Sequence, residues 1–121
     1  MRGRADLQLH VSERLALAKR AVREDDLAMA WAMLEDAHVL SQPMALPHVR
    51  VHVAMLALGT RTGDLRETAG QLMRMIVAAP GTWLGRYPVG NTGRARVRAS
   101  ESMPIRNDLQ RILDGPLEPS P

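Results

Sequence analysis

The sequence predicts an all-α fold, and three observations lead to this prediction. Apolar residues make up 45% of the 121-residue chain, and in its first 80 residues they recur at spacings of three and four, as on one face of a helix. Phenylalanine and cysteine are absent, so the core must be built from leucine, valine, alanine and eight methionines. Alanine, leucine and methionine are good helix formers. We therefore expect a compact four-helix array, followed by an irregular Gly/Pro-rich segment and a short terminal helix.

The first two helices are predicted from apolar stripes separated by an acidic turn. Residues 24–26 are acidic, and the Asp26 side chain can cap a second helix that begins at Leu27 and ends near Ser41. The stripe of the first helix, within residues 7–23, comprises Leu7, Val11, Leu15, Ala18 and Val22.

Two more helices follow at short connections. Pro47 suits the first position of a third helix, which we expect to end at Gly59. Asp64 suits the cap of a fourth helix that ends at Pro80. The apolar stripe of this fourth helix is expected to comprise Leu65, Ala69, Leu72 and Ile76.

The second and fourth predicted helices show a weak internal sequence repeat. Asp26 and Asp64 are 38 residues apart, as are Leu34 and Leu72. This spacing resembles two tetratricopeptide-like hairpins, with consecutive helices antiparallel because the connections are short. We expect a single domain over residues 1–121, with a helical core at 7–80, a wrapping loop and short helix at 81–113, and a disordered tail at 114–121.

Composition narrows the classes of function. The lack of cysteine excludes disulfides, thiolate zinc sites and iron–sulfur clusters. The net charge is only +3, and the arginines are scattered without interleaved aromatics, so nucleic acid is not an expected partner. No run of eighteen apolar residues and no export signal is found, so we expect no membrane insertion and a cytoplasmic location.

Three histidines and one glutamate form the candidate site. His48 and His52 are four residues apart, which places both imidazoles on one face of the third helix. Glu35 and His38 are three residues apart near the end of the second helix. A short turn joins these antiparallel helices, so the two faces can converge. Imidazoles with one carboxylate suit a single divalent transition metal such as zinc, iron or copper.

The competing interpretation treats these histidines as structural residues of a helix cap and core edge. His38 shares the inward stripe of Trp31 and Leu34, where an unpaired imidazole is costly, and this favours the metal. His10 lies far from the cluster and is expected to be solvated.

Other residues that could take part in the site also have structural interpretations. Glu67 and Gln71 either add a ligand or a supporting contact, or serve as capping box and surface residue, and we expect the latter. Asp36 is expected as a solvated charge. Met44 and Met55 neighbour the histidines and can ligate copper(I), but core filling is the expected role.

A set of short motifs supports a family resemblance. The motifs are Ala37-His38-Val39-Leu40-Ser41-Gln42, His48-x-x-x-His52-x-x-Met55-Leu56, Gly70-Gln71, Pro88-x-Gly90-Asn91-Thr92-Gly93 and Met103-Pro104-Ile105. Over residues 25 to 113 this pattern resembles a family of small bacterial proteins known only as a domain of unknown function. The histidine and glutamate positions match the family. The resemblance implies the domain boundaries and no activity.

We therefore expect a small helical protein that binds one metal ion through His38, His48 and His52, with Glu35 as a fourth ligand or as a residue that orients a ligand. Such a site suits a metalloenzyme acting on a small molecule, or a metal-handling protein. The alternative is a tetratricopeptide-like module that binds a protein partner, with structural histidines. A homodimer is compatible with either. A haem site fits less well, because few aromatics would line it.

Overall fold

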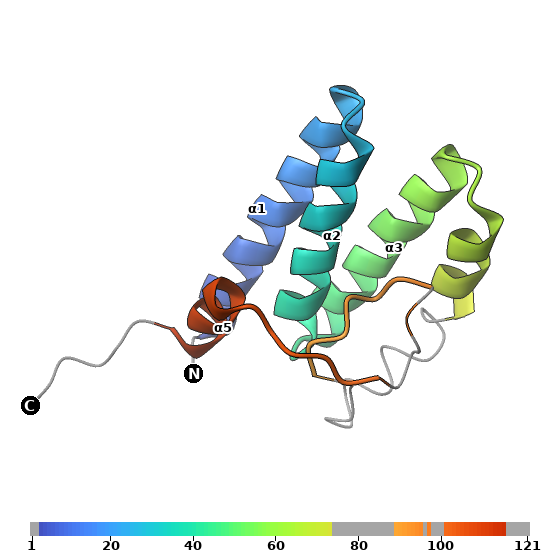
Figure 1. Cartoon of the computed structure of the whole chain (residues 1–121). Helices are drawn as coiled ribbons and strands as arrows, with labels where there is room; N and C mark the ends of the chain where they lie inside the picture. Colours follow the sequence, from blue (N-terminus) through green and yellow to red (C-terminus); the bar gives the residue numbers. More distant parts are fainter. Residues whose placement is uncertain (1–2, 74–88, 96, 98–100, 116–121) are drawn as a thin grey trace, which may run out of the picture.

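Five helical segments make up the part of the chain that the structure describes (Figure 1). This computed structural model describes residues 3–73, 89–95, 97 and 101–115. Within these residues there are helices and loops but no strand, which confirms the all-α prediction. The segments are α1 (Arg4–Arg23), α2 (Leu27–Ser41), α3 (Ala45–Arg61), a helix over residues 65–73, and α5 (Asn107–Asp114).

The polar residues at the turns set most helix boundaries as predicted. The Asp26 carboxylate accepts a hydrogen bond from the Met29 N–H at 3.1 Å, and this caps α2. Asp64 accepts from the Glu67 N–H at 3.0 Å and caps the helix over 65–73 in the same way. The third helix begins two residues before the predicted Pro47 and continues two residues past Gly59. The Thr62 hydroxyl then donates to the Leu58 carbonyl at 2.9 Å.

The core lies where α2 packs between α1 and α3 (Figure 1). Leu40, Val51 and Met55 are fully buried there. Met44 is also buried, so core filling is confirmed for the two methionines that neighbour the histidines. Among the described residues, no helix is both long enough and apolar enough to cross a lipid bilayer.

The orientation predicted for the fourth helix is wrong. Leu65 is 80% exposed and Leu72 is 50% exposed, whereas Glu67 and Gln71 are at most 1% exposed. The helix thus turns its polar pair inward, because these two side chains are hydrogen bonded to the loop over 89–95 and to α3. The predicted stripe residue Ile76 and the predicted helix end at Pro80 lie outside the described residues, as does most of the predicted tail.

The C-terminal part returns to the first two helices, where α5 contacts both α1 and α2. Asp36, expected as a solvated charge, is only 3% exposed, so that expectation is wrong. Its carboxylate pairs with Arg14 of α1 at 3.1 Å and with Arg106, which precedes α5, at 3.2 Å. A buried carboxylate requires such partners, and the two pairs tie α5 to the helical core.

Candidate metal centre

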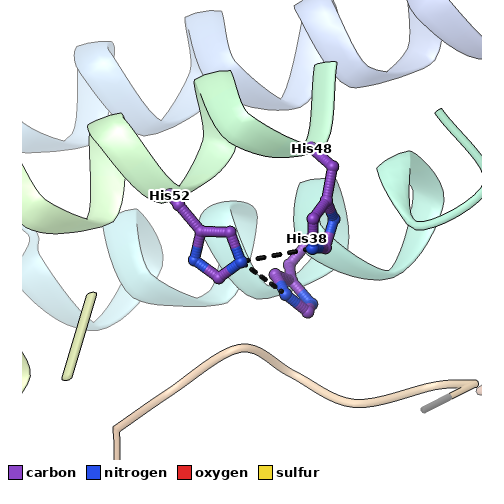
Figure 2. Close-up of side chains that lie close together, drawn as sticks. All are labelled: His38, His48 and His52. Atoms are coloured by element: carbon purple, nitrogen blue, oxygen red, sulfur yellow. Dashed lines mark hydrogen bonds between the residues drawn. The ribbon is translucent and has the colours of Figure 1, made fainter. Parts of the chain in front are cut away.

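Three histidine side chains from α2 and α3 point toward one another (Figure 2). His38 lies in the last turn of α2, and His48 and His52 lie one turn apart on α3. The tight turn over residues 42–44 reverses the chain, and this brings the end of α2 beside the start of α3. The predicted convergence of the Glu-x-x-His and His-x-x-x-His faces is therefore found for all three histidines.

The ring nitrogens are spaced as the ligands of one ion are. His52 Nε2 lies 3.2 Å from His38 Nε2 and 3.2 Å from His48 Nε2. The ligand atoms of the three residues lie within 4.8 Å of one another. Two nitrogens bound tetrahedrally to zinc at about 2.0–2.1 Å would lie about 3.3–3.4 Å apart. All three rings are buried, with at most 4% exposed.

The outer nitrogens of two rings donate hydrogen bonds to fixed acceptors. His38 Nδ1 lies 2.6 Å from the Asn91 carbonyl oxygen, which can only accept. His52 Nδ1 lies 2.6 Å from Gln71 Oε1. The Gln71 amide nitrogen faces the Glu67 carboxylate at 3.0 Å and the Gly93 carbonyl at 2.8 Å, so the amide oxygen must point to His52. Both rings therefore carry their proton on Nδ1.

The third ring is oriented by a serine. The Ser41 hydroxyl donates to the His38 carbonyl at 3.1 Å, so its oxygen is left to accept from His48 Nδ1 at 3.3 Å. Ser41 is completely buried. With the hydroxyl directed at that carbonyl, His48 carries its proton on Nδ1.

A consequence for the centre of the cluster follows from these three assignments. A neutral imidazole has one N–H, and in each ring this N–H lies on Nδ1. The Nε2 lone pair of His52 then faces those of His38 and His48, each across 3.2 Å. Converging lone pairs repel one another unless a cation lies between them. Outer-nitrogen bonds to carbonyls and amides are the arrangement that proteins use to orient metal-binding histidines.

The loop over 89–95 holds these outer contacts in place. The Gly90 N–H donates to Gln42 Oε1 at 2.8 Å, and the Gly93 N–H donates to Asn91 Oδ1 at 2.8 Å. Gly93 has a φ of +83°, and a β-carbon built on it would lie 2.7 Å from His38 Nε2. The Gly-x-x-Gly spacing of the motif thus lets the backbone lie directly against the cluster.

The Arg94 guanidinium forms ion pairs with two carboxylates, those of Glu35 and Glu67. It lies 3.0 Å from the Glu67 carboxylate, 3.3 Å from the Glu35 carboxylate and 3.7 Å from the centre of the Trp31 ring. Glu67 also accepts from the Ala95 N–H at 3.2 Å. Glu35, predicted as a ligand or orienting residue, is therefore held by Arg94, and the ligand cluster found among the described residues comprises the three histidines.

Gln71 and Glu67 lie closer to the site than the sequence predicted. The surface position expected for Gln71 is wrong, because the residue is completely buried. The capping role of Glu67 holds only for its backbone N–H, since its side chain contacts Gln71, Arg94 and Ala95 instead. Their i,i+4 spacing, the same as that of His48 and His52, was the available signal.

Burial opposes a positive charge in this cluster. Desolvation, followed by repulsion from His52, lowers the pKa of His48 from 6.5 to about 3. The ring therefore stays neutral at pH 7, which is the state that binds a metal.

This pKa predicts an acid-sensitive apoprotein. In the unfolded chain His48 takes up a proton near pH 6.5, whereas the native ring takes one up only near pH 3. The unfolded state binds more protons between these values, so stability falls as the pH falls from about 6.5 toward 3, by up to about 1.4 kcal/mol per pH unit. Urea unfolding of chelator-treated protein at several pH values measures this slope. The variant His48→Gln should have a smaller slope, and an unchanged slope would contradict the pKa.

A second prediction concerns the amide that orients His52. Gln71→Met keeps a side chain of similar length but removes the acceptor of the His52 N–H. We expect metal affinity to fall about 10- to 100-fold while the helical content is retained. Competition with a chromophoric chelator gives the affinity, and Leu72→Ala, at a half-exposed neighbour, is the matched control. Equal affinities in the two variants would show that Gln71 does not support the site.

These features define an all-α protein with a buried three-histidine cluster that can hold a metal ion. The family described as "Protein of unknown function (DUF3703)" matches residues 5–113, and the chain belongs to this family. The match includes all three histidines and the loop that carries the hydrogen-bond acceptor of His38, and it confirms the resemblance drawn from the motifs. No curated protein and no solved structure matches the chain.

Proposed function

We propose that this protein binds one divalent transition-metal ion through the Nε2 atoms of His38, His48 and His52. The observation that carries the proposal is the pair of outer hydrogen bonds from His38 and His52, whose acceptors assign the ring proton to Nδ1. If the histidines had only a structural role, we would expect their inner nitrogens to be paired by hydrogen bonds from one ring to the next. Here Nε2 of neutral His38 and Nε2 of neutral His52 are both acceptors and lie 3.2 Å apart, and a cation between the rings satisfies both.

The donor set indicates which ions fit. Three neutral imidazoles suit zinc, iron(II), nickel or copper(II), and no thiolate exists in the chain to favour softer ions. The 3.2 Å spacing agrees with short metal–nitrogen bonds rather than with the longer bonds of calcium. We propose zinc as the first ion to test, with iron(II) and copper(II) as the alternatives.

Glu35 has a proposed part in the same site. It acts through Arg94, because both Glu35 and the buried Glu67 pair with this guanidinium. Glu35 therefore helps to position the loop over 89–95 that orients His38, and it is not itself required as a ligand.

Elemental analysis tests the metal proposal. The full chain is purified without a histidine tag, and the bound transition metals are quantified before and after reconstitution of chelator-treated protein with zinc. We expect one ion per chain and a melting temperature that rises with the zinc concentration, because the ion binds only the folded site. A reconstituted protein that holds no stoichiometric metal would refute the proposal.

A groove between α1 and α3 favours a second candidate function, that of a protein-interaction module. The groove has a volume of about 710 Å³, and Leu34 of α2 lies among its lining residues. Four of the lining residues are cations and none is acidic: Lys19, Arg23, Arg50 and Arg61. We propose that α1–α2 and α3 with the helix over 65–73 form tetratricopeptide-like hairpins, and that the groove takes an acidic amphipathic helix of a partner protein.

A labelled peptide tests the groove. The probe is a short helical peptide with leucines on one face and glutamates on the other, and the control peptide replaces each glutamate with lysine. We expect fluorescence polarisation to detect binding of the acidic peptide only, and binding should be lost in the Arg50→Glu/Arg61→Glu variant. Equal binding of both peptides, or binding unaffected by this variant, would contradict the charge argument. Replacing the three histidines should leave this binding intact.

A further inference from the structure

We infer that the metal ion keeps an open fourth coordination position, and that this position takes hydroxide or a small inorganic anion. This inference rests on the metal site proposed above. It adds the class of ligand that the site receives from solution, and with it the chemistry that becomes available there.

The number of protein ligands leaves one coordination position of the ion open. Among the histidine and acidic side chains of the described residues, only these three histidines bring ligand atoms together at this point. Residues 74–88, 96 and 98–100 contain no histidine, cysteine, aspartate or glutamate, and Glu118 is the one acidic side chain beyond the described residues. A three-histidine site for a four-coordinate ion leaves one position for an external ligand, as in catalytic rather than structural zinc sites.

The charge of the metal site favours an anion as the fourth ligand. Three neutral imidazoles leave the full double positive charge of the ion uncompensated by its own ligands. The carboxylates of Glu67 and Glu35 are both paired with the Arg94 guanidinium, at 3.0 Å and 3.3 Å. Glu67 is also separated from His52 by the Gln71 amide, which bonds to both. An anion in the fourth position is therefore favoured over a neutral ligand.

The burial of the three rings limits the size of a fourth ligand. The three rings are at most 4% exposed, and the backbone of Gly93 lies against His38. A bulky ligand cannot enter such a site without displacing the loop. Hydroxide and small inorganic anions meet both the charge and the burial of the site. A bound water at this position would lose a proton near neutral pH and become a nucleophile.

Cobalt(II) provides the test, because its visible absorption reports the number and kind of its ligands. Chelator-treated full-length protein is loaded with one equivalent of cobalt(II) and titrated with sodium azide. We expect an intense spectrum of four-coordinate cobalt that shifts with azide and saturates at one azide per cobalt. Sodium perchlorate at the same ionic strength, whose anion coordinates metal ions only weakly, and the His10→Ala variant serve as controls, since His10 lies outside the cluster.

The outcomes separate the two proposals. Cobalt uptake with an azide-dependent shift supports the open position. Cobalt uptake with a spectrum that azide leaves unchanged overturns the open position, while the metal site stands. Failure to take up cobalt or zinc overturns the metal site, and the open position falls with it.

Discussion

Alanine in place of His52 is expected to abolish stoichiometric metal binding, with an affinity loss of more than about 100-fold. His52 is the middle ring of the cluster, because its Nε2 lies 3.2 Å from the Nε2 atoms of both other histidines. Its removal leaves two ligands from different helices and a Gln71 oxygen without its donor. Metal content after reconstitution with zinc, together with the zinc dependence of the melting temperature, measures the effect.

The matched control is His10→Ala, which removes the only histidine outside the cluster. This variant should bind zinc as the wild type does. Circular dichroism establishes that His52→Ala remains helical, and added imidazole can enter the cavity and restore part of the zinc binding. If His52→Ala retains a full equivalent of zinc with unchanged affinity, the three-histidine site is wrong.

Gly93→Ala is expected to destabilise the protein by about 2–5 kcal/mol, and the melting temperature should fall by roughly 8 °C or more. Two effects add at this residue. The φ of +83° disfavours any side chain, and the new β-carbon would lie 2.7 Å from His38 Nε2. The loop must move away, so the Asn91 carbonyl that orients His38 is displaced and zinc affinity falls as well.

Gly63→Ala separates these two effects. Gly63 has a similar φ of +73°, but no heavy atom beyond its two chain neighbours lies within 4 Å of the position of its β-carbon. This variant should lose only about 1 kcal/mol, from backbone strain, and its zinc affinity should be unchanged. Thermal and urea unfolding of both variants measures the difference. If Gly93→Ala is no less stable than Gly63→Ala, the close contact between the loop and His38 is absent in solution.

The helices that rest on local signals were predictable. The capping aspartates Asp26 and Asp64 and the apolar spacing of α1 are properties of short segments, and a carboxylate next to free backbone N–H groups acts in the same way in any fold. The His-x-x-x-His pair is local too, because four residues make one turn of helix. Its convergence with His38 required only the short turn between two antiparallel helices.

The fourth helix shows where local signals fail. An apolar stripe predicts the buried face only when the partner surface is apolar, and this partner is a polar loop. Leu65 and Leu72 therefore face outward, while Glu67 and Gln71 are buried against Arg94 and Gly93. The buried carboxylate of Asp36 likewise depends on Arg106, which is 70 residues away in the chain.

The sequence alone determined that the chain is helical, where its first three helices lie, and which three residues make up the candidate metal site. Only the tertiary structure decided which atoms of those residues face inward. The inner nitrogen of a neutral ring is left as an acceptor when the outer nitrogen donates to a fixed partner, and the partners here come from Asn91, Gln71 and Ser41. Two of these residues lie 53 and 19 positions from the histidines they orient, a pairing that no local spacing encodes.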